Sequence, residues 1–275
     1  MLVGYNIGRI YTFEGIAKVI NCFTLIMCLL FIIIAIFSDF EKISIPPDSH
    51  ALIVFTSMYF IYHLKNKSKV LLAILILSIV GLGSFLSFHR ITFLSFLFAF
   101  IAVYVIRNKF ILFSMTSVLV YAFIDNYYIV ADFFELVISQ PDLVLDLSAS
   151  QRIKESILIY NTLINKEIVL LGAGFGAFYY NTDLIQHYPE FVHQGHVSPM
   201  MLLFRNGVIG FLMYMILVFF SGYCVFDRSK KVFIFSSALL FSMFASLFDF
   251  YFYWGTHLGI LIGLLIYYRK NEKTS

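Results

Sequence analysis

Long apolar runs separated by short polar breaks dominate this sequence. A helix that crosses a bilayer needs ~20 mostly apolar residues, because lipid offers no hydrogen-bond partner to a free backbone group. The pattern therefore predicts an all-α polytopic membrane protein with about eight transmembrane helices. The runs cover residues 16–37, 47–64, 70–88, 91–106, 110–124, 204–226, 232–250 and 252–268.

Lysine and arginine occupy alternate breaks, at residues 65–69, 107–109 and 228–231, and they recur after the last run. Such residues tend to stay on the cytoplasmic side of a membrane. If these breaks lie inside, both termini are cytoplasmic, and most of the 19 Lys and Arg residues lie inside as well. The orientation leaves six of them outside: Lys42, Arg90, Arg152, Lys154, Lys166 and Arg205.

The composition agrees with a chain whose main solvent is lipid. Hydrophobic residues make up 61% of the chain and charged residues only 13%, and the mean hydropathy is +0.89. A soluble domain is roughly half apolar and about a quarter charged. No basic stripe accompanies the net charge of +3, so no nucleic-acid partner is expected. All three cysteines lie in apolar runs, which predicts no disulfide in an exported loop.

The stretch from 125 to 203 contains no run that could span a bilayer, and the orientation above places it outside the cytoplasm. The chain is thus predicted to divide into five membrane helices (1–124), a large external loop (125–203), and three membrane helices with a cytoplasmic tail (204–275). The first apolar run lacks a small-residue cleavage pattern, so the first helix is expected to remain in the protein. A loop of this length in a compact protein is typically functional.

Residues 149–164 of this loop are predicted to form an amphipathic helix that lies against the membrane domain. We expect Ser150 to cap it and Arg152 to lie in its first turn. Its apolar stripe at helical spacing consists of Ile153, Ile157, Tyr160 and Ile164.

Two short motifs follow this predicted helix. Gly172-Ala-Gly174 permits a tight turn or the close approach of a ligand, and no Lys-Ser or Lys-Thr follows it, which excludes a Walker phosphate loop. His193 and His196 precede the sixth membrane helix. Either histidine is a candidate general base, because imidazole accepts a proton near neutrality, although a loop histidine more often only hydrogen-bonds the structure. Two ligands do not make a metal site, so no metal is expected.

Three arginines are candidates for binding an anion at the outer face. Arg90 interrupts an apolar region, and a guanidinium near a bilayer costs ~2.5 kcal/mol or more unless it is paired, snorkels or faces water. Because guanidinium binds phosphate oxygens bidentately, Arg90 and Arg152 together would hold a diphosphate. Arg205 is either a third phosphate contact or an interfacial anchor for the sixth helix, and anchoring is the alternative for Arg90 as well.

The order and spacing of these residues resemble those of the O-antigen polymerase and O-antigen ligase superfamily. The resemblance covers roughly residues 50–268, with Val197 where the family usually has asparagine and with fewer helices than the ten or more that are common there. Four features carry it: Arg90 near a helix end, Arg152 in a large external loop, the Gly172-Ala-Gly174 turn, and His196 followed by Gly207 and Gly210.

This resemblance implies an inverting glycosyltransferase of the bacterial inner membrane that needs no metal or cofactor. Its donor would be a glycan on undecaprenyl diphosphate, with the diphosphate held by Arg90 and Arg152. His196 would act as the general base, with His193 as the alternative base or an orienting partner. Gly172, Gly174 and Arg205 are further candidate site residues. A chain-length regulator and a flippase are candidate partners.

Three alternatives remain open. A ligase shares the donor and the chemistry; a polymerase is favoured because polymerases are the more divergent set and the Phe-, Ile- and Lys-rich composition is typical of a sugar-specific gene cluster. A transporter or flippase would have charged residues near mid-bilayer or broken helices in repeated halves, and neither is evident in the sequence. A purely structural subunit would not require the Arg and His residues to converge.

Overall fold

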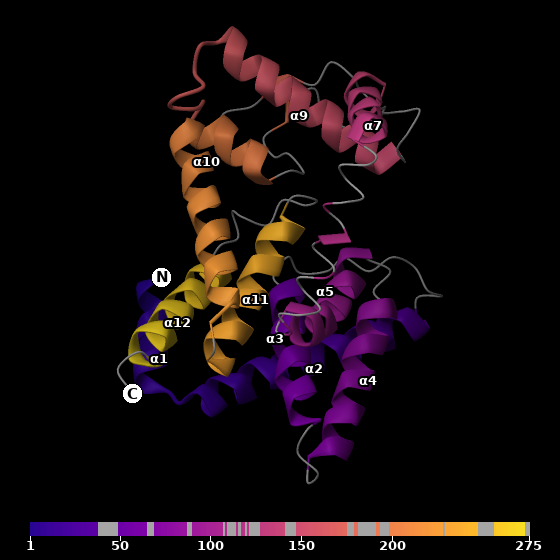
Figure 1. Ribbon diagram of the computed structural model, residues 1–275, viewed down its shortest axis with the longest axis vertical. Coiled ribbons are helices and arrows are strands. Elements are labelled where there is room, and N and C mark those ends of the chain that lie inside the picture. The colour runs from indigo at the N-terminus through magenta and orange to yellow at the C-terminus, as the bar shows by residue number, and fades with distance from the viewer. Residues whose placement is uncertain are drawn as a thin grey trace. The chain divides into compact units, whose positions relative to one another are not determined.

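The computed structural model is α-helical, with one short antiparallel strand pair in the part of the chain it describes. That part comprises residues 1–37, 49–64, 69–86, 90–106, 108, 114, 117–118, 120, 127–140, 147–174, 179–180, 191–192, 198–227, 229–246 and 256–272. In chain order the elements are α1 (Leu2–Ile10), α2 (Phe13–Phe37), α3 (Ser49–His63), α4 (Val70–Leu86), α5 (Arg90–Ile101), the π-helical η1 (Ala102–Ile106), α7 (Tyr127–Ser139), α9 (Leu147–Asn165), β1 (Tyr179–Tyr180), β2 (Phe191–Val192), α10 (Ser198–Val225), α11 (Lys230–Ala245) and α12 (Thr256–Glu272) (Figure 1).

Helices occupy seven of the eight predicted apolar runs, and the eighth, 110–124, lies largely outside the described residues. Within the described ranges, two helices are long and apolar enough to cross a membrane, α2 and the Pro199–Val225 part of α10. Val70–Leu86 and Thr92–Ile106 are shorter apolar helices. The structure therefore supports the helical class and, by length and composition, a membrane protein, whereas the number of spans stays a prediction.

The sequence pattern did not predict two of the helices, α1 and α7. A search for apolar runs long enough to span a bilayer does not detect helices of 9 and 13 residues. Short helices are marginal alone and depend on packing against the rest of the protein. For α1, that packing partner is α12.

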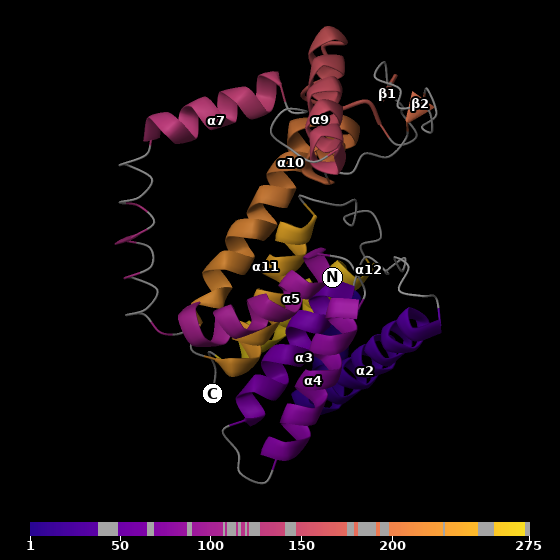
Figure 2. The same ribbon diagram turned by 90° about the vertical axis from the view of Figure 1, so that its right-hand side faces the viewer.

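The chain forms two compact units. Unit 1 comprises residues 1–112, 218–245 and 251–275, and unit 2 comprises residues 113–217 and 246–250. In unit 1, α3 is central and contacts α2, α4, α5 and α11 (Figures 1 and 2). Ile53, Val54, Phe55 and Met58 on successive faces of α3 are fully buried. A helix that is hydrophobic all round takes such a central place, because no face has to meet solvent.

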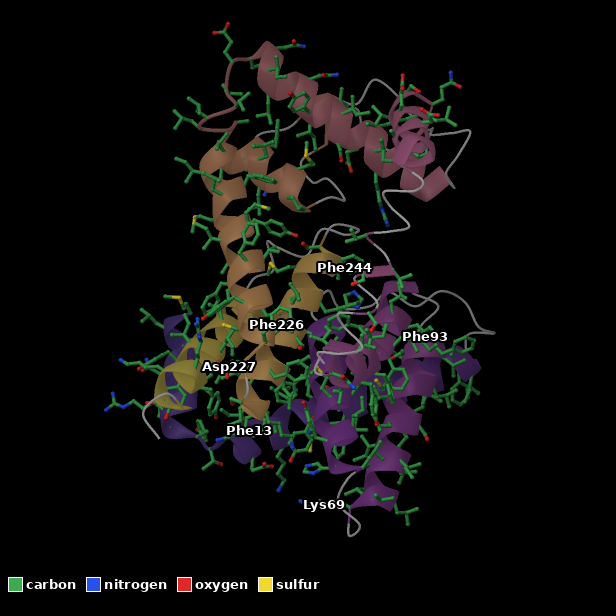
Figure 3. All side chains as sticks on the ribbon, in the orientation of Figure 1. Phe13, Lys69, Phe93, Phe226, Asp227 and Phe244 are labelled. Atoms are coloured by element: carbon green, nitrogen blue, oxygen red, sulfur yellow. The ribbon has the colours of Figure 1, made fainter. Side chains whose placement is uncertain are left out.

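An aromatic cluster around Phe13 joins four helices of unit 1 (Figure 3). The Phe13 ring lies at the start of α2, 5.8 to 6.3 Å between centroids from rings on α3, α11 and α12. Edge-on and tilted aromatic pairs add roughly 0.5–1.5 kcal/mol each beyond the burial of their surface. The partners are Phe55, Tyr59, Phe235 and Tyr268.

Buried hydroxyl groups connect α2 to α3. Thr56 donates a hydrogen bond to the hydroxyl of Thr24 at 2.9 Å, and Thr24 donates to the carbonyl of Ile20 at 2.9 Å. Interhelical hydrogen bonds of this kind contribute about 0.6 kcal/mol on average between membrane helices. They align the two helices more than they stabilise the unit.

Glycines at four-residue spacing bring α1 and α12 into backbone contact. The pairs are Gly4 with Gly8 on α1, and Gly259 with Gly263 on α12. A Cβ at Gly263 would lie 2.5 Å from the Tyr5 nitrogen and would overlap the carbonyl of Met1. Small residues at this spacing let helix backbones approach closely in membranes, where packing rather than the hydrophobic effect drives helix association. Met1 lies beside Gly259 and Gly8 beside Tyr267, so the two helices run parallel.

Gly263→Leu is therefore expected to separate α1 from α12 and to lower the free energy of unfolding by about 1–3 kcal/mol, as overpacking typically does. The matched control is Gly222→Leu, because a Cβ at Gly222 meets nothing within 4 Å. Equilibrium unfolding in mixed detergent, followed by circular dichroism, measures both variants. Equal unfolding free energies for the two variants would refute the close packing of α1 on α12.

Candidate functional site

Gly207 breaks α10 in unit 2. Its φ is 64° and its ψ is −161°, a backbone conformation that is essentially restricted to glycine. The helix changes direction near this point (Figure 1). In an unbroken helix, the carbonyl of Phe204 would accept a hydrogen bond from the N–H of Val208, and the carbonyl of Arg205 from the residue after it. The break opens this ladder, and the exposed groups need other partners.

Residues 168–174, which we call the docking loop, supply those partners. They follow α9 and lie against the break with their own backbone. Three hydrogen bonds join the two segments: Ala173 N–H to Phe204 O at 2.6 Å, Gly174 N–H to Arg205 O at 3.0 Å, and Val208 N–H to Val169 O at 3.0 Å. A buried backbone group without a hydrogen-bond partner costs free energy, so the docking loop stabilises the broken helix by supplying these partners.

The contact requires glycine on both sides. A Cβ at Gly172 would lie 2.5 Å from the Gly207 nitrogen and 2.6 Å from the Arg205 carbonyl oxygen. A Cβ at Gly207 would overlap the carbonyl group of Leu170. The close approach that the structure shows at Gly172 is thus made by the backbone of α10.

The predicted loop helix is present as α9 and is longer than expected. It begins at Leu147, so Ser150 lies inside the helix and is buried, which corrects its assignment as the cap. Arg152 consequently lies in the second turn rather than the first. The predicted buried stripe is also wrong in part, because Tyr160 and Ile164 are about half exposed while the adjacent Ile159 and Leu163 are buried. An error of one residue rotates the apparent face of a helix by ~100°.

Arg152 offers a donor that the described part of the chain does not use. Its Nε atom is buried and has no hydrogen-bond partner among the described residues. The Ser156 hydroxyl donates a hydrogen bond to the backbone carbonyl of Arg152 at 2.8 Å. This bond does not use the guanidinium. A buried donor without a partner costs about 1–3 kcal/mol or more when it is charged. An anionic ligand would remove that cost.

The structure brings together three of the predicted site residues. Gly172 and Gly174 lie against Arg205, which is on the segment Ser198–Asn206 that precedes the break. Arg152 belongs to the same unit, on α9.

The remaining candidates are not placed. Arg90 begins α5 in unit 1, and its side chain lies outside the described residues. His193 and His196 also lie outside the described residues. His196 stands two positions before Ser198, the first residue of α10. The described part of the site thus comprises Arg152, Arg205 and the backbone contact between the docking loop and α10.

The described part of the chain contains no candidate set of metal ligands. Among those residues, no group of three or more His, Cys, Asp and Glu side chains could hold a metal ion. Two basic candidate residues, Arg152 and Arg205, lie on two helices of unit 2. Such groups suit the binding of a phosphate or diphosphate rather than a cation.

Reasoning from the sequence identified the glycines individually but missed their pairing. Gly172 and Gly207 are distant in the chain, and the pattern between them does not indicate a contact. The available signal was the run Arg205-Asn-Gly207-Val-Ile-Gly210 in an apolar helix, since glycine inside a helix costs about 1 kcal/mol and usually has a packing or functional reason.

No family model, no curated protein and no solved structure matches this chain.

Proposed function

We propose that this protein is a bacterial inner-membrane glycosyltransferase that polymerises glycan repeats carried on undecaprenyl diphosphate. The observation that carries the proposal is the backbone docking of Gly172 and Gly174 on the α10 break at Gly207. These two segments hold two of the motifs on which the family resemblance rests. A function that depends on both motifs gives a reason for their contact.

The chemistry asks for two things at the outer face of the membrane. The departing lipid diphosphate needs fixed positive donors, a role for Arg152 and Arg90. The acceptor hydroxyl must lose its proton as it attacks the anomeric carbon, a role for His196 or, in its place, His193. Attack from the side opposite the diphosphate inverts that carbon. The donor of Arg152 that has no partner among the described residues supports the first role.

The proposed topology has eight spans and an external loop that carries α9. The part of α10 after the break, residues 208–225, is about 27 Å long at about 1.5 Å per residue. That length nearly matches a hydrocarbon core of ~30 Å. The break at Gly207 would then lie near the outer boundary of the core, where lipid-linked substrates present their diphosphate.

The orientation at the start of the chain follows from α12. Arg269 and Lys270 lie in the last turn of α12 and mark its cytoplasmic end. Because α1 runs parallel to α12, its C-terminal end with Arg9 belongs on the same side. We therefore assign the turn between α1 and α2 to the cytoplasm. Met1, which lies beside Gly259 near the start of α12, then belongs toward the outer end of that helix, in place of the cytoplasmic N-terminus that the charge pattern predicts.

The lipid-linked glycans that accumulate on gene deletion test the function. Loss of a polymerase is expected to leave single repeats on undecaprenyl diphosphate at the outer face, and restoring the gene should lengthen them without transfer to lipid A. Accumulation of long lipid-linked chains would instead identify a ligase. Unchanged glycan profiles would refute the proposed glycosyltransferase.

Arg152→Lys is expected to lower chain growth about ten- to hundredfold, because it keeps the charge but loses the bidentate fork, and a charge-assisted hydrogen bond contributes about 1.5–3 kcal/mol. Lys166→Gln is the matched control, since it removes an exposed loop cation at the other end of α9. Quantifying polysaccharide length in a deletion strain at equal protein level compares the two. Wild-type growth with Arg152→Lys would show that this arginine is structural.

A transporter is the second candidate function, and the break in α10 favours it. Secondary transporters bind their substrates at discontinuous helices, whose presence the sequence did not reveal. In those proteins the broken helices occur in repeated halves near the membrane midplane. Gly207 is the one break inside a helix that the described residues show, and it leaves the single stretch 208–225 of α10 to cross the membrane. Accumulation of lipid-linked repeats on the cytoplasmic side after deletion would identify the transporter.

A further inference from the structure

The docking loop carries two of the most exposed apolar side chains of unit 2. Leu170 is 71% exposed and Leu171 is 76% exposed, and they follow Ile168 and Val169 directly. Two adjacent leucines at the tip of a loop are poorly suited to water. The backbone of the same loop is occupied, since Val169, Gly172, Ala173 and Gly174 all form backbone hydrogen bonds.

The loop tip adjoins the apolar surface of α10. Val169 accepts a hydrogen bond from Val208, and the exposed stripe of the helix begins at the next residue. This stripe follows helical spacing and continues along the part of α10 proposed to cross the membrane. It consists of Ile209, Leu212, Met213, Ile216, Phe219 and Tyr223, all more than half exposed.

The end of α9 adds to the same kind of surface. Tyr160 and Ile164, one helical turn apart, are about half exposed. Exposed polar residues, Asn165, Lys166 and Glu167, then separate this end of the helix from Leu170. Aromatic rings and charged groups of this kind are typical of the interface between headgroups and acyl chains.

We propose that Leu170 and Leu171 insert into the acyl chains of the outer leaflet, so that the docking loop anchors the end of α9 to the bilayer beside the α10 break. The occupant of this surface is lipid, because the surface continues the stripe of a helix long and apolar enough to span a membrane. Backbone can enter hydrocarbon only when its polar groups are satisfied. The hydrogen bonds of Val169, Gly172, Ala173 and Gly174 fix the backbone on both sides of the leucine pair, so the side chains of Leu170 and Leu171 can enter the acyl chains while their own backbone stays at the level of the headgroups. The inference rests on the membrane placement made under the proposed function and adds a second, shallow anchor to it.

Tryptophan fluorescence in vesicles tests the insertion. Trp254 is the single tryptophan of the chain, so Trp254→Phe provides a background for Leu171→Trp. The protein is reconstituted in phosphatidylcholine that carries bromine near the carbonyl end of one acyl chain. Emission from Leu171→Trp is expected to fall roughly two-fold relative to unbrominated lipid and to resist aqueous iodide, as for a side chain at the acyl boundary.

Two further variants separate the possible failures. Lys166→Trp should be quenched mainly by iodide, because this position is exposed and polar in the native chain. Met213→Trp lies in the α10 stripe and should respond to brominated lipid if α10 spans the bilayer. Quenching of Met213→Trp without quenching of Leu171→Trp would overturn the anchor while leaving the span intact. If neither responded, the membrane placement itself, and with it the proposed function, would fail.

Discussion

Gly207→Ala is expected to release the docking loop from α10. The native φ and ψ of Gly207 cost an L-residue about 1–3 kcal/mol, and the added methyl group would also overlap the Leu170 carbonyl. The three hydrogen bonds between the segments would be strained or lost, each with a net contribution of about 0.5–1.5 kcal/mol. Local opening should become easier by about 3 kcal/mol, which is roughly a hundredfold in the equilibrium.

Tryptic cleavage after Lys166, two residues before the docking loop, measures this opening. Release of the loop frees the adjoining backbone, and cleavage of such a segment tracks the population of its open form. Three glycines provide graded comparisons. Gly172→Ala should behave like Gly207→Ala, since it combines a positive φ with an overlap. Gly174→Ala has a positive φ of 85° but open space around its Cβ, so its rate should rise less. Gly222→Ala is the control, because a Cβ at Gly222 meets nothing within 4 Å and no positive φ is recorded there. If trypsin cleaved Gly207→Ala as slowly as this control, the docking of the loop would be contradicted.

His196→Ala is expected to lower chain growth by about 10²–10⁴-fold, the usual contribution of a general base. The acceptor hydroxyl would no longer lose its proton to a positioned group in the transition state. The variant should still insert in the membrane and bind the lipid-linked donor, because neither depends on the proton transfer. Polysaccharide length in a deletion strain, at matched protein level, measures the effect.

Two other histidines of the segment 125–203 make the test specific. His187→Ala removes an imidazole for which no role is proposed and should retain wild-type chain growth. His193→Ala distinguishes the general base from an orienting partner. If His193→Ala lowered chain growth more than His196→Ala does, His193 would be the base and His196 the orienting partner. Normal polysaccharide from His196→Ala would remove this residue from the mechanism.

The positions of the long helices could be predicted from the local pattern of apolar residues. The apolar run 16–37 predicted α2, which begins three residues earlier, and the periodicity around Ile157 predicted α9. Such predictions succeed because a backbone in lipid must form helix wherever its side chains are apolar for long enough. The predicted stripe of α9 failed at Tyr160 and Ile164, because which face of a helix is buried depends on a partner that the sequence does not name.

For the candidate site, too, the sequence predicted some features and not others. Local sequence was sufficient to single out Arg152, Gly172, Gly174 and Arg205 as residues whose type is unusual at their position. It did not reveal that Gly207 breaks α10, since φ and ψ of a glycine are set by its surroundings as much as by its own freedom.

By itself, then, the sequence determined a helical chain that is mostly apolar, with charges in alternate breaks and one long segment that contains no run able to span a bilayer. Only the tertiary structure decided that the Gly172-Ala-Gly174 turn repairs the broken backbone at Gly207, and that α1 packs in parallel on α12. The physical reason is the distance along the sequence over which each interaction acts. Helix formation depends on neighbouring residues and solvent, whereas hydrogen bonds and close backbone contacts between distant segments depend on the packing of the folded chain.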